Sequence, residues 1–262
     1  MNLALFRDVF AAEWTKLRSV RSTYWCGLLA IVVGIGFGAA ISAGNASEYK
    51  SADLIDKVMF DPTALSTAGL FFAQLALGVM AILVMSSEYS TGTIRTTLAA
   101  VPQRGYPLAA KTALLALIGT FVGVGTAFAS FFVCEPIFKH YDIPRDVSIG
   151  APHVLRAVLG AGLYIGVMVL FALGLAVIIR HTAGAITTLV GIVFIVPIVT
   201  QLLPDSWQEH FSRYLPANAG SAITSTVHQS NSLPPWGGFF VFVGWAALSL
   251  AVGWYLLRTR DV

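Results

Sequence analysis

One segment of the sequence comes close to a nucleotide-binding pattern. Residues 105–112 read GYPLAAKT, which fits G-x-x-x-x-G-K-[ST] except that Ala110 replaces the second glycine. In that pattern a glycine-rich loop after a β-strand cradles phosphates with its backbone N–H groups, and the lysine reaches the terminal phosphates. Here the segment follows Pro102 and leads into a long apolar run. We therefore expect no nucleotide site and no catalytic residue in this chain.

Other patterns that carry chemistry are missing from the sequence. It contains no H-E-x-x-H, no G-x-S-x-G and no Cys/His spacing of a metal site, so we expect no metal ion or cofactor in this chain. No Asp, Glu, Lys or Arg falls in the middle of a long apolar run. That absence argues against a self-sufficient ion-coupled transporter, an ion channel and an intramembrane enzyme.

The composition indicates a membrane protein. Of the 262 residues, 56% are hydrophobic and only 11% are charged, whereas soluble domains carry about 25% charged residues. The net charge is +3, but the basic residues are scattered between apolar runs and form no patch. We therefore exclude nucleic acid as a partner and expect the lipid bilayer to surround the chain.

Six segments are long enough to cross a bilayer as helices, which takes about 20 apolar residues. None of them alternates like the strand of a membrane barrel. The sequence therefore predicts an all-α polytopic membrane protein, with residues 1–262 forming a single transmembrane domain. The spans are expected at residues 23–44, 63–87, 112–134, 157–179, 183–203 and 237–257.

The distribution of Lys and Arg predicts the orientation of these spans. With the N-terminus inside, ten of the 16 Lys and Arg residues lie on the inner side and six on the outer side. Basic residues are enriched on the cytoplasmic side of membrane proteins. Both termini, and the polar segment 88–104 between the second and third spans, are therefore expected in the cytoplasm.

The residues before the first span predict an amphipathic helix in the inner membrane interface, over residues 3–24. Apolar residues recur on one arc of this segment at about 100° per residue, with Trp14 near the edge of the arc. Lys16 and Arg18 are basic residues that can reach the lipid headgroups. The pattern is typical of a helix that lies on a membrane rather than spanning it.

Glu13 is the exception in this helix, because by angle it falls inside the apolar arc. A carboxylate is costly there unless it is paired. Three explanations are open. The side chain can reach headgroup water, it can pair with Arg95 or Arg104 of the next cytoplasmic segment, or it can take a direct part in transport.

The segment 88–104 is expected to hold a short cytoplasmic helix. Ser90 or Thr91 is expected to cap its N-terminus, and Pro102 to end it. An apolar stripe follows from the spacing of Ile94, Leu98 and Val101. A connection that only turns back needs a few residues, so an amphipathic helix implies a surface on which it docks; the alternative is an interfacial turn helix without a partner.

Two glutamines are the deepest polar groups of the spans. Gln74 lies near the centre of the second span and Gln201 in the outer half of the fifth. Both can line a translocation path, or both can make interhelical hydrogen bonds. Three Gly-x-x-x-Gly pairs are expected to serve mainly close helix packing within the chain: Gly34/Gly38, Gly119/Gly123 and Gly162/Gly166.

Four segments of the chain resemble the permease subunit of ABC-2-type transporters, the membrane-spanning part of bacterial exporters with a type V, ABCG-like fold. They follow the family's order along the whole chain: EWTKLRS at 13–19, EYSTGTIRTTLAAVPQR at 88–104, LAVIIRHTAGAI at 175–186 and YLPANAGSAI at 214–223. The segment 88–104 is the most specific of the four.

The resemblance implies partners for this chain. In the family, the segment between the second and third spans docks on a separate ABC ATP-binding subunit, which holds ATP and Mg²⁺. Carried over by position, the contact would be made by Glu88, Tyr89, Gly92, Thr93, Ile94, Arg95 and Leu98. A second permease subunit, in a homodimer or a heterodimer, would enclose the path with residues of the second and fifth spans: Phe71, Phe72, Gln74, Leu75 and Gln201.

As the resemblance implies, the chain is expected to be the permease of an ATP-driven exporter in the bacterial cytoplasmic membrane. It would move an amphipathic or hydrophobic compound, such as a drug, an antibiotic, a peptide or a lipid-like molecule, out of the cell. The alternative is a membrane sensor or immunity protein that binds a partner or an antibiotic without transport. A neighbouring reading frame for a soluble ATPase would favour the exporter.

Overall fold

The computed structural model describes residues 3–101, 103, 105–143, 148–200, 202, 211–227 and 232–260, with Leu98 described by its backbone alone. Within these ranges all regular structure is helical. Six helical segments there are long and apolar enough to cross a membrane, which confirms the predicted fold class. Their bounds are Arg21–Ser51, Pro62–Ser90, Gly105–His140, Val154–Ile179, Thr182–Thr200 and Pro235–Thr259.

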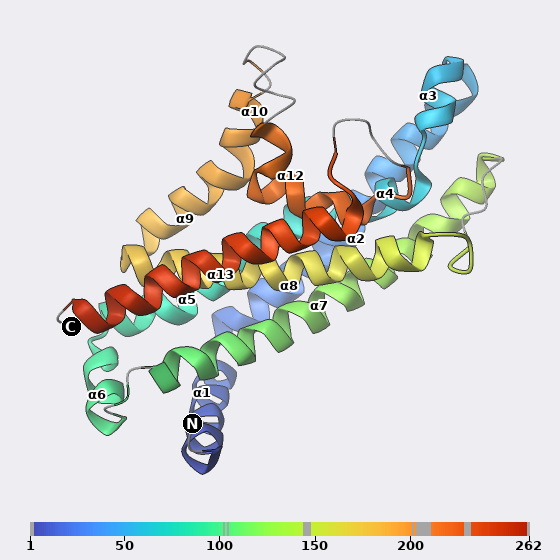
Figure 1. Ribbon diagram of the computed structural model, residues 1–262. Helices are drawn as coiled ribbons and strands as arrows, with labels where there is room; N and C mark the ends of the chain where they lie inside the picture. Colours follow the sequence, from blue (N-terminus) through green and yellow to red (C-terminus); the bar gives the residue numbers. More distant parts are fainter. Residues whose placement is uncertain are drawn as a thin grey trace.

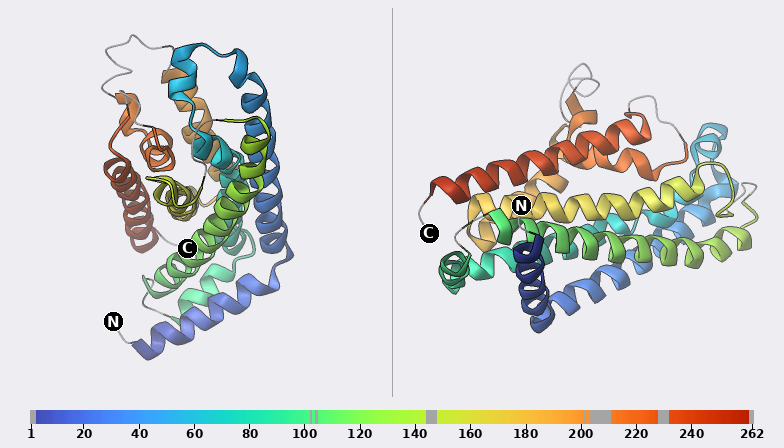
Figure 2. Two further views of the ribbon diagram at one scale, coloured as in Figure 1. Left: turned by 90° about the vertical axis from the view of Figure 1, so that its right-hand side faces the viewer. Right: turned by 60° about the horizontal axis from the view of Figure 1, so that its bottom comes forward.

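Five long helices run side by side in one bundle (Figure 1). They are α2 (Arg21–Glu48), α5 (Leu70–Ser90), α7 (Gly105–His140), α8 (Val154–Ile179) and α13 (Pro235–Thr259). The helix α8 lies between α13 on one flank and α7 on the other, and most of its residues are buried (Figure 2). The core of the molecule is therefore built around α8.

The two ends of the bundle carry different elements. Both described ends of the chain lie at the end with α1 (Leu3–Ser19) and α6 (Thr93–Ala100), as Figures 1 and 2 show. We call this the α6 end. The opposite end, called the α3 end, carries α3 (Leu54–Met59) and the short helix α4 (Pro62–Thr67).

The N-terminal helix and the third span have other bounds than the sequence predicted. The helix predicted over 3–24 ends at Ser19, because Val20 is extended (φ −96°, ψ 113°) and turns the chain from α1 into α2 at Arg21. The third span begins at Gly105 rather than at residue 112. The charge of Lys111 suggested a boundary, but that lysine is buried within α7.

The fifth span differs from the others in shape. It consists of α9 (Thr182–Val190), a π-helical turn over Gly191–Ile195, and α10 (Val196–Thr200), and it leans away from the bundle (Figure 1). Proline has no N–H for the helical hydrogen bond and crowds the preceding turn, and π-helical turns accommodate such interruptions. Only Val196 separates Pro197 from the π-helical turn, so this turn lies where the proline interrupts the helical hydrogen bonds.

A second group of short elements packs on α13 toward the α3 end. It consists of the 3₁₀ turn Ser212–Tyr214, α12 (Pro216–Ser221) and the 3₁₀ turn Ala222–Thr224. Its small residues, among them Ala217, Ala219 and Gly220, are buried. The segment therefore covers the bundle instead of extending away from it.

Close contacts between helix backbones hold the bundle together. The glycines of α7 and α8 face each other, since a Cβ on Gly123 would lie 2.7 Å from the carbonyl oxygen of Gly162. Gly34 and Gly38 of α2 meet Gly69, which lies between α4 and α5. The prediction that the Gly-x-x-x-Gly pairs serve packing within the chain is confirmed.

We expect Gly69→Ala to destabilise the fold strongly. The added Cβ would lie 2.0 Å from the carbonyl oxygen of Gly34 and 2.5 Å from the nitrogen of Gly38. Both are backbone atoms of α2, so relief requires a shift of a whole helix, and we expect a loss of about 3 kcal/mol. Thermal unfolding of the purified protein in detergent measures this loss.

The matched control is Gly36→Ala, because a Cβ at Gly36 meets nothing within 4 Å. Alanine also favours a helix interior over glycine by about 1 kcal/mol. The control should therefore unfold at the same temperature as the wild type or higher. Equal unfolding temperatures for the two variants would contradict the proposed contact.

Candidate functional site

Four charged side chains from three helices meet at the α6 end of the bundle. Glu13 of α1, Glu88 of α5 and Lys111 of α7 are only 3%, 6% and 3% exposed. The ammonium group of Lys111 donates to Glu13 Oε2, and at 2.9 Å to Glu88 Oε1. Lys16 donates to Glu13 Oε1 at 2.8 Å and to Glu88 Oε1 at 2.9 Å. We call these residues the ion cluster.

The ion cluster is formally neutral, because it holds two carboxylates and two ammonium groups. Removing charges from water is costly, and the cost is offset only when partners of opposite sign are held in good geometry. Burial lowers the pKa of Lys16, but hydrogen bonds and charges of Glu13 and Glu88 outweigh burial and raise that pKa above its ordinary value. Lys16 is therefore charged at neutral pH.

The structure corrects the expectation that Glu13 pairs with a base of the segment 88–104. Arg95 is exposed, Arg104 lies outside the described residues, and Glu13 binds Lys16 and Lys111 instead. The spacing i, i+3 on α1 is a sequence signal for Lys16. No short-range signal exists for Lys111, which is 98 residues from Glu13.

The ion cluster also contacts α6. The ammonium group of Lys16 donates to Thr97 Oγ1 at 3.2 Å, so one side chain touches α1, α5 and α6. On α6, Ile94 is 5% exposed and packs against the bundle. A helix of eight residues is too short to be stable alone in water, and these contacts fix its position.

The prediction that Ser90 or Thr91 caps α6 is wrong. Gly92 occupies the N-cap position with φ 72°, in the left-handed region, and no side chain caps the helix. The hydroxyl of Thr91 instead donates to the carbonyl oxygen of Ser87 at 2.7 Å, as part of the end of α5. The chain turns from α5 to α6 within two residues, Thr91 and Gly92, and glycine adopts the left-handed conformation without strain.

The residues predicted to contact an ATP-binding subunit fall into two groups. Gly92, Thr93 and Arg95 are exposed on the outer surface of α6. Glu88 and Ile94 are buried, Tyr89 is half-buried, and the side chain of Leu98 lies outside the described residues. The role of all seven in partner binding stays a prediction, but Glu88 acts within the chain, in the ion cluster.

The last turn of α5 has a second attachment, on the side of the hairpin between α8 and α9. Thr182 and Ser86 share a hydrogen bond between their hydroxyls at 2.8 Å. The guanidinium of Arg180 lies 5.4 Å from the ring centre of Tyr89 and donates to the carbonyl oxygen of Leu256 at 3.2 Å. The end of α5 is therefore joined to α1 and α7 by the ion cluster and to the hairpin between α8 and α9 by these contacts, and Arg180 joins that hairpin to α13.

The helix α1 buries one side and exposes the other. Val9, Glu13 and Leu17 are buried at intervals of four residues. Trp14 is 43% exposed and Arg18 is exposed. The helix therefore buries one narrow stripe and leaves the rest of its surface open.

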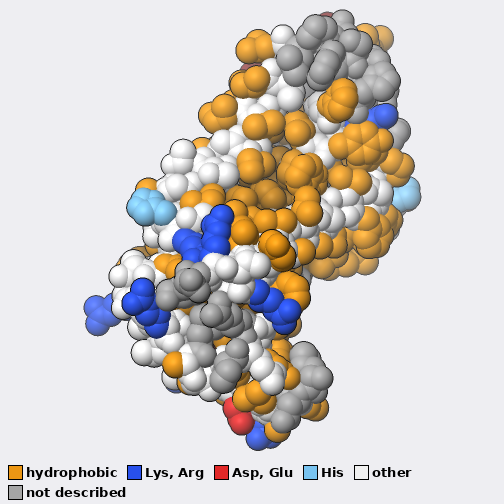
Figure 3. All heavy atoms as spheres, turned by 60° about the vertical axis from the view of Figure 1, so that its left-hand side comes forward, with side chains coloured by type: hydrophobic (Ala, Val, Ile, Leu, Met, Phe, Trp, Pro, Cys, Tyr) orange, Lys and Arg blue, Asp and Glu red, His pale blue; other side chains and the backbone are white. Residues whose placement is uncertain are grey.

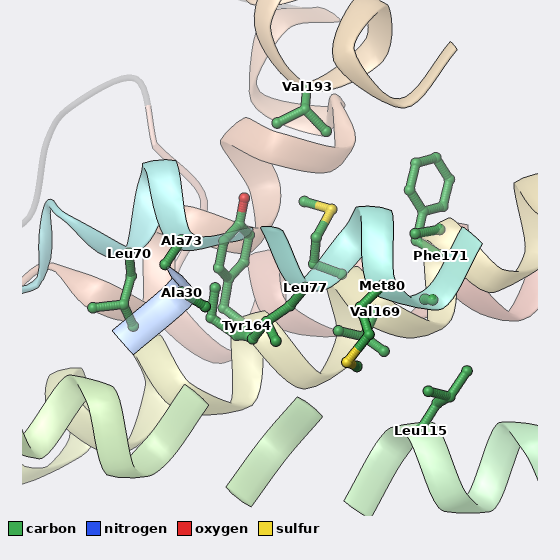
Figure 4. Close-up of a cluster of buried hydrophobic side chains, with 14 of the residues drawn as sticks. Ala30, Leu70, Ala73, Leu77, Met80, Leu115, Tyr164, Val169, Phe171 and Val193 are labelled. Atoms are coloured by element: carbon green, nitrogen blue, oxygen red, sulfur yellow. The ribbon is translucent and has the colours of Figure 1, made fainter. Parts of the chain in front are cut away.

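Gln74 lies in the core and makes an interhelical hydrogen bond. It is 1% exposed, and its side-chain oxygen accepts a hydrogen bond at 2.5 Å from the hydroxyl of Tyr164 on α8. Figure 4 shows Tyr164 rising from α8 between Ala73 and Leu77 of α5. Of the two roles open for Gln74, its geometry supports the interhelical bond.

Two of the other residues predicted for a substrate path, Phe71 and Phe72, line a hollow between α5 and the fifth span. This hollow, called the apolar hollow, has a volume of about 370 Å³, and Phe71 and Phe72 line it together with Tyr164. Phe71 and Phe72 are 43% and 37% exposed. Leu75 is half-buried away from this lining, and Gln201 lies outside the described residues.

These features define a multi-pass helical membrane protein in which a short polar helix is anchored to the ends of several spans. The family described as ABC-2 family transporter protein matches residues 9–199. The chain therefore belongs to the ABC-2 transporter family and is a membrane permease subunit of an ABC transporter. Membership implies an ABC ATP-binding subunit as a partner. No curated protein matches the chain.

We expect Lys111→Met to destabilise the protein by about 3–5 kcal/mol, the usual cost of leaving a buried charge without its partner. Methionine preserves the length of the side chain but leaves two buried carboxylates with Lys16 alone. The unfolding temperature in detergent should fall by several degrees.

Lys139→Met on the same helix is the matched control. Lys139 pairs with Glu135 at 2.6 Å, but its side chain is 69% exposed. Exposed pairs contribute about 0–1 kcal/mol, so this variant should unfold close to the wild-type temperature. A wild-type unfolding temperature for Lys111→Met would contradict the structural role of the ion cluster.

Proposed function

We propose that this chain is the permease of an ATP-driven exporter in the bacterial cytoplasmic membrane. It moves an amphipathic or hydrophobic compound out of the cell with energy from ATP that a separate subunit, with its Mg²⁺, binds and hydrolyses. Two permease subunits, identical or different, enclose the path. The observation that carries the proposal is the anchoring of α6 to the ion cluster through Lys16 and Thr97.

The anchoring supports a mechanical role for α6. An ATP-binding subunit that presses on the exposed Thr93 and Arg95 moves α6 and, through Gly92, the end of α5. Stretching the ion cluster would leave buried charges unpaired, at a cost of several kcal/mol. The ends of α1, α5 and α7 therefore move together, and the contacts of Ser86 and Tyr89 carry the movement to the hairpin of α8 and α9.

The distribution of charge supports a cytoplasmic position for the α6 end. Figure 3 looks toward this end, where Lys and Arg side chains gather below a mainly hydrophobic flank. Exposed basic residues at this end come from four elements: Arg18, Arg21, Arg95, Arg258 and Arg260. Both termini then lie in the cytoplasm, where α6 can meet an ATP-binding subunit.

The proposal is tested by coexpressing the chain with a candidate ABC ATP-binding subunit. We expect the two proteins to purify together, with ATP hydrolysis that depends on the permease. Arg95→Glu reverses a charge on the exposed face of α6, and we expect it to weaken the complex about tenfold, which corresponds to about 1.4 kcal/mol. Titration of ATPase binding and the hydrolysis rate report this change.

Arg7→Glu is the matched control, because Arg7 is exposed on α1 and its only ion pair among the described residues is with the exposed Asp8 at 3.8 Å. It should bind and stimulate the ATPase like the wild type. If no ATPase copurifies and Arg95→Glu has no effect, the exporter is excluded, and a sensor or immunity protein that works without transport takes its place.

A further inference from the structure

Two hollows adjoin on the α3 side of the molecule. One, called the polar hollow, has a volume of about 730 Å³ and is lined in part by Asp61, His153, Arg156 and Arg213. The other is the apolar hollow of about 370 Å³. Both volumes fall in the range of small-molecule sites, about 300–1,000 Å³. The hollows share four lining residues, Ala64, Asn218, Ser221 and Thr224, so one ligand can occupy both.

The carboxylate of Asp61 does not neutralise the arginines of the polar hollow by direct contact. Its Oδ1 accepts the backbone N–H groups of Thr63 and Ala64 at 3.1 and 3.0 Å, which caps α4. Its Oδ2 accepts the Ser225 hydroxyl and the N–H groups of residues 226 and 227 at 2.6–3.0 Å. Five uncharged donors therefore occupy the oxygens of this carboxylate.

The two arginines have more donors than the described part of the chain satisfies. Arg156 donates from Nη2 to the carbonyl oxygen of Ser225 at 2.7 Å, but its buried Nε has no hydrogen-bond partner there. Arg213 stacks on Tyr214 with its guanidinium 5.2 Å from the ring centre, and its buried Nε also has no partner among the described residues. A guanidinium carries five donors and matches planar or tetrahedral anions.

The apolar hollow offers a different surface to the same ligand. Besides Phe71 and Phe72 it is lined by Tyr164, Val193 and Pro197, and no charged residue belongs to its described lining. Such a surface takes up hydrocarbon, because burial of apolar area is favourable. The border between the hollows is formed by the shared residues of α4, of α12 and of the 3₁₀ turn that follows α12.

We propose that the two hollows form one site for a single-chain amphiphile with an anionic headgroup. The carboxylate or phosphate of this compound binds Arg156 and Arg213, and its hydrocarbon chain lies against Phe71 and Phe72. The inference deepens the exporter proposed above and rests on it, since it assigns the chemical class of the exported compound. It also places the headgroup toward the α3 end, the outer side in that proposal.

The test is equilibrium binding to the full chain in phosphatidylcholine nanodiscs, with empty nanodiscs as the blank. The probes share a 12-carbon chain: dodecyl phosphate, dodecyltrimethylammonium and dodecyl maltoside. We expect dodecyl phosphate to bind at least about tenfold more tightly than the other two and than inorganic phosphate, because charge-assisted hydrogen bonds and chain burial then act together.

Two substitutions separate a binding role from a folding role. Arg156→Gln also removes a hydrogen bond to the backbone of Ser225, so it can disturb the fold. Arg213→Gln loses no hydrogen bond within the described residues and should weaken dodecyl phosphate about tenfold at an unchanged unfolding temperature. Lys50→Gln, which removes a 70% exposed charge at the same end, should bind like the wild type.

Three outcomes overturn the site. One is equal affinity for the anionic and cationic probes, and another is wild-type binding by Arg213→Gln. The third is displacement of dodecyl phosphate when phosphatidylglycerol is added to the nanodiscs, which would assign the site to a bilayer lipid. None of these measurements needs the ATPase. Loss of the expected binding together with intact ATPase coupling would reject the substrate class alone. Arginine-dependent binding without ATPase coupling would reject the exporter alone.

Discussion

The buried ion cluster is the constraint on which the arrangement of the α6 end depends. Glu13 and Lys111 are almost inaccessible to solvent and come from helices far apart in the sequence. A buried ion pair is seldom a net source of stability, because desolvation offsets most of the attraction. What it does supply is a geometric requirement: any arrangement that separates one member leaves an unpaired charge in the interior. The ion cluster therefore makes the ends of α1, α5 and α7 one unit.

The helix α5 connects this unit to the rest of the molecule. At the α6 end it carries Glu88, and the turn at Gly92 then leads into α6. In its middle, Gln74 is bonded to Tyr164 of α8, and Phe71 and Phe72 line the apolar hollow. At its other end, the N-cap residue Gly69 lies in close contact with the backbone of α2. In the exporter proposed above, a displacement of α6 that moves α5 along its axis would act on both the ion cluster and the apolar hollow, because α5 contributes residues to both.

The sequence predicts the six spans well, because the thickness of a bilayer imposes a length and a composition that local sequence must meet. It predicts contacts between distant residues poorly. The cost of burying Glu13 was visible from its angle on α1, but its partner Lys111 is on another helix. Counting charges as boundaries also placed the start of the third span too late, because a paired lysine can lie inside a helix. The cap of α6 was missed because the left-handed turn at Gly92 competes with side-chain capping.

The ion cluster and the polar hollow differ in whether their charges are paired within the described part of the chain. In the ion cluster, two carboxylates and two ammonium groups pair with one another within the chain, although the buried Glu88 Oε2 has no hydrogen-bond partner among the described residues. In the polar hollow, Asp61 is satisfied by uncharged donors, and the buried Nε atoms of Arg156 and Arg213 have no acceptor among the described residues. Charges of opposite sign that are paired within the chain resist separation and suit the transmission of force. Arginines without such ion pairs gain from an added anion and suit the binding of a ligand. The two kinds of polar chemistry are thus divided between the two ends of the bundle.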